Sequence, residues 1–204
     1  MLNKKIDSFS ETITLLSIKK DRDYLMLYII TYKSIKFFPG SPSPSMIDIE
    51  DIAHALSLTN RFSGHSKFPL SVARHSINCS LMASPERQME ALLHDATEAY
   101  ISDISRPTKK LLAEYVQLEA NIYRNAIAPA FNLPPVLSKE VLEIDDRMLI
   151  TESMALLNDY SWVKKLNGDP YPFSSDMISE RGWREDESDF LKRYEEIKNA
   201  TFLY

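Results

Sequence analysis

Apolar residues recur at helical spacing along most of the chain. A helix over residues 50–58 places Ile49, Ile52, Ala53 and Leu56 on one face. Further helices are predicted over 68–82, from 84 to about 100, from 105 towards Pro129, from 138 to about 160, and over 187–198. Serines precede several of these starts and provide helix caps, with Ser84 followed by proline and an acid, and Ser138 opening the long fifth helix.

Outside the predicted helices, the sequence predicts only short strands and loops. Residues 25–31 predict a short strand and residues 35–38 a small β-ribbon, inside a proline- and serine-rich stretch. Residues 161–187 predict a loop. With only 4 glycines, the sequence favours helices over tight hairpins. We therefore predict an all-α bundle of five or more helices with a small irregular N-terminal element.

Length, charge and cysteine content narrow the class of protein. A chain of 204 residues predicts one domain, here residues 26–204 after an N-terminal extension over 1–25. The net charge of -5 argues against a partner that is a nucleic-acid polymer. No apolar run is long enough to cross a membrane, and no signal peptide precedes the helices, so we expect a cytoplasmic protein without a membrane partner. The single cysteine, Cys79, fits a reducing compartment and reads as a packed core thiol rather than a nucleophile.

Candidate chemistry concentrates between residues 61 and 103. Three of the 4 histidines lie here, and His94 is followed directly by Asp95 within an apolar helix pattern. Buried imidazole and carboxylate need a partner, and a divalent metal binds both. An ordinary buried hydrogen-bond network is the competing interpretation, and the residues alone weigh the two evenly. His54, on the first helix, is expected to be structural.

Four sequence blocks carry a family resemblance. The stretches DIAHALS at 51–57, RFSGH at 61–65, SVARHS at 71–76 and LLHDATEAYISD at 92–103 resemble the small HD-domain metal phosphohydrolases, bacterial 5′-deoxynucleotidases and phage dATP triphosphohydrolases. A departure lies before SVARHS, where Pro69-Leu70 replaces the aromatic pair usual in the family and leaves base selectivity open.

The resemblance implies a metal site and a catalytic base. Its metal ligands match His75, His94 and Asp95, and the pattern Asp-x-Arg-x-Leu-x-Thr-Glu selects Asp145, although periodicity alone separates Asp145 from Asp146 poorly. Such a donor set suits Zn, Co, Mn, Fe(II) or Mg without identifying one. Glu98 matches the family's catalytic glutamate and is expected to act on water.

The resemblance also implies a substrate-binding set. We expect Arg61, His65 and Lys109 to bind phosphates, with Lys109 at a helix start. Arg106 is expected to be a surface charge. Lys110 is a less favoured candidate for phosphate binding than its neighbour Lys109. Asp103 is expected to accept a deoxyribose hydroxyl. Phe62 is expected to stack on the base, with a core position equally open.

The predicted function is metal-dependent hydrolysis of deoxynucleoside phosphates. Three cations exceed the need of one phosphate, so the first prediction is a dNTP (dATP) triphosphohydrolase. A 5′-deoxynucleotidase acting on dNMPs is the alternative within the same class, and a non-catalytic nucleotide-binding HD module is the alternative outside it. The resemblance further implies a homo-oligomer, of a kind that phages encode and that acts in the host cytoplasm.

Overall fold

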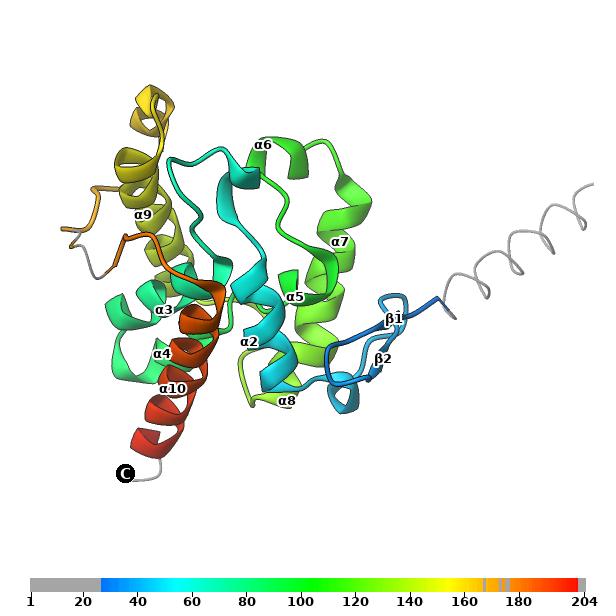
Figure 1. Cartoon of the computed structure of the whole chain (residues 1–204). Helices are drawn as coiled ribbons and strands as arrows, with labels where there is room; N and C mark the ends of the chain where they lie inside the picture. Colours follow the sequence, from blue (N-terminus) through cyan, green and yellow to red (C-terminus); the bar gives the residue numbers. More distant parts are fainter. Residues whose placement is uncertain (1–26, 167, 173, 175–176, 202–204) are drawn as a thin grey trace, which may run out of the picture.

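The computed structural model describes residues 27–166, 168–172, 174 and 177–201. The predicted N-terminal extension over 1–25 lies outside the described residues, as do the first two residues of the strand predicted over 25–31. The described part is mostly helical, which confirms the all-α class (Figure 1). Among the described residues, the only regular β-structure is an antiparallel pair of strands, β1 (Ile29–Ile30) and β2 (Lys36–Phe37). They lie where the sequence predicted a strand and a β-ribbon.

Helices follow the ribbon to the end of the described chain. They are α2 (Ile49–Leu58), α3 (Val72–Met82), α4 (Gln88–Leu92), α5 (Glu98–Ile101), α6 (Arg106–Lys109), α7 (Ala113–Ile122), α8 (Ala128–Ala130), α9 (Lys139–Leu156) and α10 (Trp183–Thr201). Single 3₁₀ turns lie at Pro44–Met46, Arg61–Gly64, Pro85–Arg87 and Ser161–Lys165, and a π-helical turn spans Tyr123–Ile127.

Two predicted helices are broken in the structure. The helix predicted from 84 to about 100 consists of four pieces in the structure: a 3₁₀ turn, α4, a turn over 93–97, and α5. The one predicted from 105 is divided into α6 and α7, and it continues through the π-helical turn into α8, which contains Pro129. Because proline cannot donate a backbone hydrogen bond and crowds the preceding turn, the wider π-turn just before it relieves that conflict.

Helix caps account for where other helices begin. The Ser138 side chain accepts a hydrogen bond from Val141 N, so the predicted start of α9 is confirmed, although α9 ends at Leu156 instead of about residue 160. Ser84 instead turns its side chain to Glu140 at 3.0 Å and caps nothing. The last helix begins at Trp183, four residues before the predicted 187.

The main core lies where α2, α3 and α10 pack together with α4 and α5 (Figure 1). Ile52, Leu56, Val72, Leu92 and Phe190 are fully buried there. A buried ion pair joins α3 to α10, with Arg74 Nε donating to Asp186 Oδ1 at 2.9 Å. This packing fixes α3 and the turn after α4 against each other. Within the described residues no helix has both the length and the apolarity needed to cross a membrane.

Candidate metal centre

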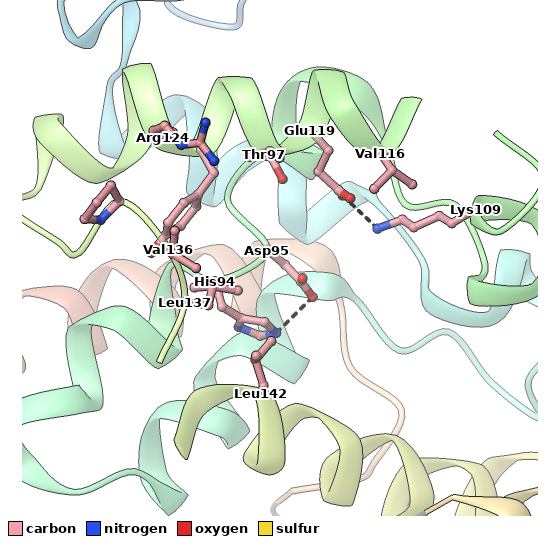
Figure 2. Close-up of a pocket in the computed structure, with 13 residues that line it drawn as sticks. His94, Asp95, Thr97, Lys109, Val116, Glu119, Arg124, Val136, Leu137 and Leu142 are labelled. Atoms are coloured by element: carbon pink, nitrogen blue, oxygen red, sulfur yellow. Dashed lines mark hydrogen bonds and ion pairs between the residues drawn. The ribbon is translucent and has the colours of Figure 1, made fainter. Parts of the chain in front are cut away.

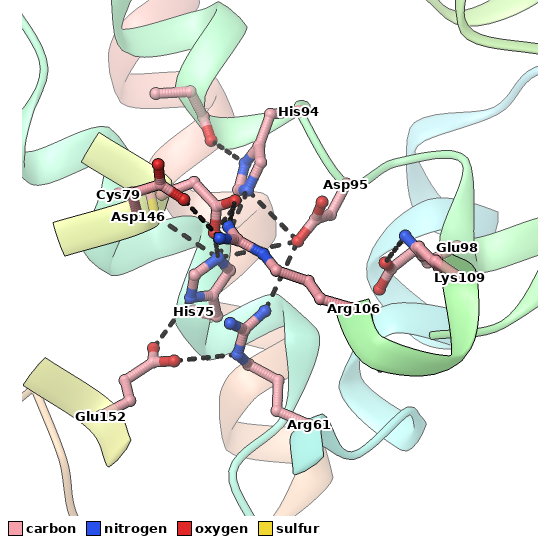
Figure 3. A network of polar contacts seen from close by, with 12 residues as sticks. Arg61, His75, Cys79, His94, Asp95, Glu98, Arg106, Lys109, Asp146 and Glu152 are labelled. Carbon is pink, nitrogen blue, oxygen red and sulfur yellow. Dashed lines mark hydrogen bonds and ion pairs between the residues drawn. The ribbon is translucent and has the colours of Figure 1, made fainter. Parts of the chain in front are cut away.

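Four side chains predicted as metal ligands converge on one point (Figure 3). His75 Nε2 lies 3.3 Å from His94 Nε2 and 3.2 Å from Asp145 Oδ1. His94 Nε2 lies 3.2 Å from Asp95 Oδ2 and 3.9 Å from Asp145 Oδ1, and His75 Nε2 lies 3.6 Å from Asp95 Oδ2. The elements α3, α9 and the turn between α4 and α5 each contribute to this set.

These separations suit a metal ion at the centre of the four atoms. Four donors at about 2.1 Å from an ion in a regular tetrahedron lie about 3.4 Å from one another. The five measured separations run from 3.2 to 3.9 Å. Two imidazole nitrogens and two carboxylate oxygens are also donors that divalent transition metals accept. The residues present therefore fit a metal in both spacing and chemistry.

A break in the helix explains how two adjacent residues reach the same point. On a continuous helix, His94 and Asp95 would point about 100° apart. Instead α4 ends at Leu92, and Leu93 leaves helical geometry at φ -109° and ψ 10°. His94 and Asp95 lie in the following turn, so the prediction of an unbroken helix through Glu98 was wrong. The break lets both side chains face α3.

Hydrogen bonds on the far side of each imidazole fix its orientation. His75 Nδ1 lies 2.8 Å from Glu152 Oε1, and His94 Nδ1 lies 2.8 Å from the Ala91 carbonyl oxygen. With both Nδ1 atoms donating, the two Nε2 atoms are directed at the centre, where each can bind either a proton or a metal. Glu152 is fully buried and was not predicted as a site residue, although it ends the Asp-x-Arg-x-Leu-x-Thr-Glu pattern.

The electrostatics of the cluster call for a cation. Burial lowers the pKa of His75 and of His94, but the surrounding acidic groups outweigh it, and both pKa values lie well above the ordinary one. Burial raises the pKa of Asp145, but the two histidines outweigh it and hold that pKa well below its usual range. The His94 imidazole likewise lowers the pKa of Asp95. Positive charge at this point, from protons or a metal, is therefore strongly favoured.

Cys79 is a core thiol as predicted, and it also lies beside the histidines. It is fully buried, one helical turn beyond His75 on α3, and its Sγ lies 3.6 Å from His75 Nε2. Potential ligand atoms of His75, Cys79 and His94 all lie within 4.8 Å of one another. The spacing of four residues between His75 and Cys79, which puts both on one face of a helix, is the sequence feature that could have predicted this contact.

Glu98 is buried close to the centre and is held by Lys109. Its Oε1 lies 3.3 Å from Lys109 Nζ, which also contacts Glu119 Oε1 at 2.7 Å. Burial, together with the nearby Asp95 and Asp103 carboxylates, raises the pKa of Glu98 well above its ordinary value. Lys109 lies in the first turn after the predicted helix start at Ser105, and α6 ends with it. Glu119 was not predicted.

The RFSGH block forms a turn with an unusual backbone. Phe62, Ser63 and Gly64 have φ values of 57°, 51° and 77°, a left-handed conformation that costs a non-glycine residue about 1 kcal/mol or more. The turn buries Arg61, whose Nε lies 2.8 Å from Glu152 Oε2 and whose Nη1 lies 3.7 Å from Asp95 Oδ2. The half-buried Phe62 ring lies 5.7 Å from the Arg61 guanidinium, while His65 is exposed.

Arg106 and Asp103 extend the centre on its α6 side. Arg106 Nη2 lies 2.6 Å from Asp145 Oδ2, the oxygen that faces away from the histidines, and its Nη1 donates to Asp146. The Arg106 side chain is 41% exposed, as expected of a surface charge, but it also contacts a candidate ligand. Asp103 is half-buried, and burial raises its pKa.

A cavity of about 330 Å³ adjoins the centre (Figure 2). His94 and Asp95 form one side of it, and Lys109, Glu119 and Arg124 add charged groups. The exposed apolar side chains Val116, Val136 and Leu142 complete the wall. A volume of this size, with apolar walls and a few polar groups, is typical of sites for small molecules.

Comparison with known proteins identifies relatives of this chain. No model of a known protein family matches the sequence. An uncharacterized protein of Rhodobacter capsulatus is 38% identical over 106 residues, which cover 47% of this chain and 54% of that protein. The uncharacterized protein YfdR of Escherichia coli is 41% identical over 146 residues, which cover 71% of this chain and 82% of YfdR. With most of YfdR matched at this identity, the chain belongs to the protein family of YfdR.

Proposed function

We propose that this protein is a metal-dependent phosphohydrolase of the HD type that acts on deoxynucleoside phosphates. The observation that carries the proposal is the set of four donor atoms, two imidazole and two carboxylate, at separations of 3.2 to 3.9 Å. A cavity of about 330 Å³ shares His94 and Asp95 with that set, so a small substrate can reach it. The resemblance of the sequence blocks to HD phosphohydrolases supports the same conclusion.

A divalent metal held by these residues supplies Lewis acidity to a phosphoryl oxygen and makes water more acidic. The chain provides the proton acceptor. Glu98 Oε2 is buried and has no hydrogen-bond partner among the described residues, while Oε1 is held by Lys109. Its raised pKa brings Glu98 closer to neutrality, where a general base works best. Glu98 takes the proton of the attacking water, and Lys109 keeps its carboxylate in place.

Of the proposed substrate-binding groups, Lys109 lines the cavity beside this acceptor. Lys109 lines the cavity and contacts Glu98, so it can meet a phosphate oxygen without leaving the catalytic group. Arg61 lies behind Asp95 and lends positive charge to the same point. Half-buried Asp103, on the loop between α5 and α6, is proposed to accept the deoxyribose hydroxyl. Phe62 is proposed to stack on the base, and His65 to contact the outer phosphates.

For the number of phosphates, dNTP hydrolysis with release of triphosphate remains the first proposal, and dATP is the substrate to test first. One observation favours the second candidate, a 5′-deoxynucleotidase. Lys109 pairs with two carboxylates, and Arg61 pairs with Glu152. This pairing leaves less free positive charge for a triphosphate than the sequence suggested. A substrate with a single phosphate needs less positive charge from the protein than a triphosphate does.

The experiment is hydrolysis of dATP and dAMP by the whole chain with zinc, cobalt or manganese, with products separated by ion-exchange chromatography. Triphosphate and deoxyadenosine from dATP are the expected products. Lys109→Ala should weaken hydrolysis of dATP more than that of dAMP, with the neighbouring Lys110→Ala as the control. Equal losses on both substrates contradict the triphosphate proposal. No hydrolysis of either substrate, or of the other deoxynucleotides, contradicts the proposed function.

A further inference from the structure

The Cys79 thiol occupies a position from which it can bind the same ion as the histidines. It extends from α3 one turn after His75, its side chain is fully buried, and its Sγ lies 3.6 Å from His75 Nε2. His94 Nε2 in turn lies 3.3 Å from His75 Nε2. The sulfur is therefore about as close to His75 Nε2 as the carboxylate oxygens are, and it lies within 4.8 Å of a ring nitrogen of His94.

The measured separation matches what metal ligation requires. A nitrogen at about 2.1 Å and a sulfur at about 2.3 Å from one ion, with about 109° between the two bonds, lie about 3.6 Å apart. The observed distance between Cys79 Sγ and His75 Nε2 is 3.6 Å. The spacing between these two atoms already suits ligation of one ion by both.

Core packing explains only part of this arrangement. Cys79 belongs to a small apolar cluster with Ala83, Ala91, Ile144 and Met148, where a buried cysteine behaves as a small hydrophobic residue. Packing alone does not require the sulfur to face an imidazole nitrogen. Because Glu152 accepts a hydrogen bond from His75 Nδ1, the Nε2 atom is the ring nitrogen that faces the sulfur and can bind an ion.

We infer that Cys79 is a metal ligand, so that the centre selects thiophilic ions such as zinc, Co(II) or Fe(II) over magnesium. This inference rests on the proposed metal centre and specifies its metal class. On binding, the thiol loses its proton to solvent, and the sulfur electron pair forms the bond to the ion. Magnesium prefers oxygen ligands and would gain nothing from the sulfur.

The test uses Co(II) as the probe, added to chelator-treated full-length protein. Thiolate ligation gives a charge-transfer band in the near ultraviolet, and because the chain has 1 cysteine, any such band belongs to Cys79. The band should appear with one equivalent of Co(II) and disappear in Cys79→Ser while the weaker visible bands of Co(II) remain. Zinc should displace Co(II), and a large excess of magnesium should not.

Three outcomes separate the two claims. Visible Co(II) bands without the charge-transfer band overturn the role of Cys79 and leave the metal centre intact. Absence of any Co(II) binding overturns both. If Cys79→Ser fails to fold, X-ray absorption of the zinc-loaded wild-type protein decides, because a sulfur neighbour at about 2.3 Å supports the inference and a shell of only nitrogen and oxygen overturns it.

Discussion

At the scale of single residues, the candidate metal centre includes side chains that lie behind the candidate ligands and hold them in place. Glu152 lies between His75 and Arg61, 2.8 Å from each, and none of its surface is exposed. Its charge keeps the His75 imidazole oriented with Nε2 towards the centre. It also balances the buried Arg61 guanidinium, which would be costly to leave unpaired.

Replacing Glu152 by glutamine should weaken metal binding. The amide keeps the shape but loses the charge that orients His75 and raises its basicity, so zinc affinity should fall on the order of 10- to 100-fold. Competition with a chromophoric chelator measures the affinity. Glu143→Gln, at an exposed position of the same helix, is the matched control and should change nothing. Equal affinities in Glu152→Gln and wild type would refute this role.

Glu98→Gln separates chemistry from binding. The variant keeps its size and its contact with Lys109 but can no longer accept a proton from water. With metal content unchanged, kcat should fall by a factor on the order of 10² or more. Steady-state kinetics and metal analysis of the same samples check this. A loss of metal in proportion to the loss of activity would instead make Glu98 a ligand.

The residue types of the centre could be predicted from the sequence, but several partners could not. His75, His94, Asp95 and Asp145 meet as expected, because motif and spacing identify them. Glu119, Glu152 and Arg106 depend on how α6, α7 and α9 pack around the centre, which local sequence does not reveal. Cys79 lies in the core as predicted, but its contact with His75 could not be predicted from burial alone.

At the scale of elements, breaks in helices do as much as the helices themselves. The end of α4 at Leu92 turns His94 and Asp95 towards α3. Apolar periodicity runs through this break and therefore predicted one continuous helix. The short α6 places Arg106 and Lys109 at the centre on two sides, and the sequence predicted it only as the first turn of a longer helix.

The ion pair between α3 and α10 should stabilise the frame that holds His75. Asp186→Ala leaves the buried Arg74 charge without its main partner and should lower the free energy of unfolding by about 3 to 5 kcal/mol. The Asp189 side chain, which also contacts Arg74, is 38% exposed. Asp189→Ala should therefore lower the free energy of unfolding by about 1 kcal/mol or less. Urea denaturation measures both. A loss for Asp189→Ala as large as for Asp186→Ala would contradict this ranking.

At the scale of the whole molecule, metal and protons should compete for the same charges. Without metal, the raised pKa values of His75 and His94 give stability that is complete below about pH 6.5 and is lost as pH rises through those values. The lowered pKa values of Asp95 and Asp145 give stability that is present above about pH 3.8 and lost as pH falls through those values. Metal should take the place of the protons on the histidines.

Thermal unfolding at about pH 6 and about pH 8 tests this competition. With a chelator present, Tm should be lower at the higher pH, because the histidine contribution is fading. Added zinc should raise Tm at both values, and more at the higher pH, where fewer protons oppose it. A zinc effect that shrinks as pH rises would contradict the assignment of the histidines as ligands.

The central claim is that His75, His94, Asp95 and Asp145 hold one divalent metal, and metal content measures it most directly. Purified wild-type protein, His94→Ala, Asp145→Asn and Asp146→Asn are to be loaded with zinc, desalted and analysed by mass spectrometry of the metal. Asp146 is the matched control, since it also contacts Arg106 but lies outside the set of four. We predict about one zinc per chain in wild type and Asp146→Asn, and almost none in the other two. Full zinc content in His94→Ala and Asp145→Asn would contradict the account.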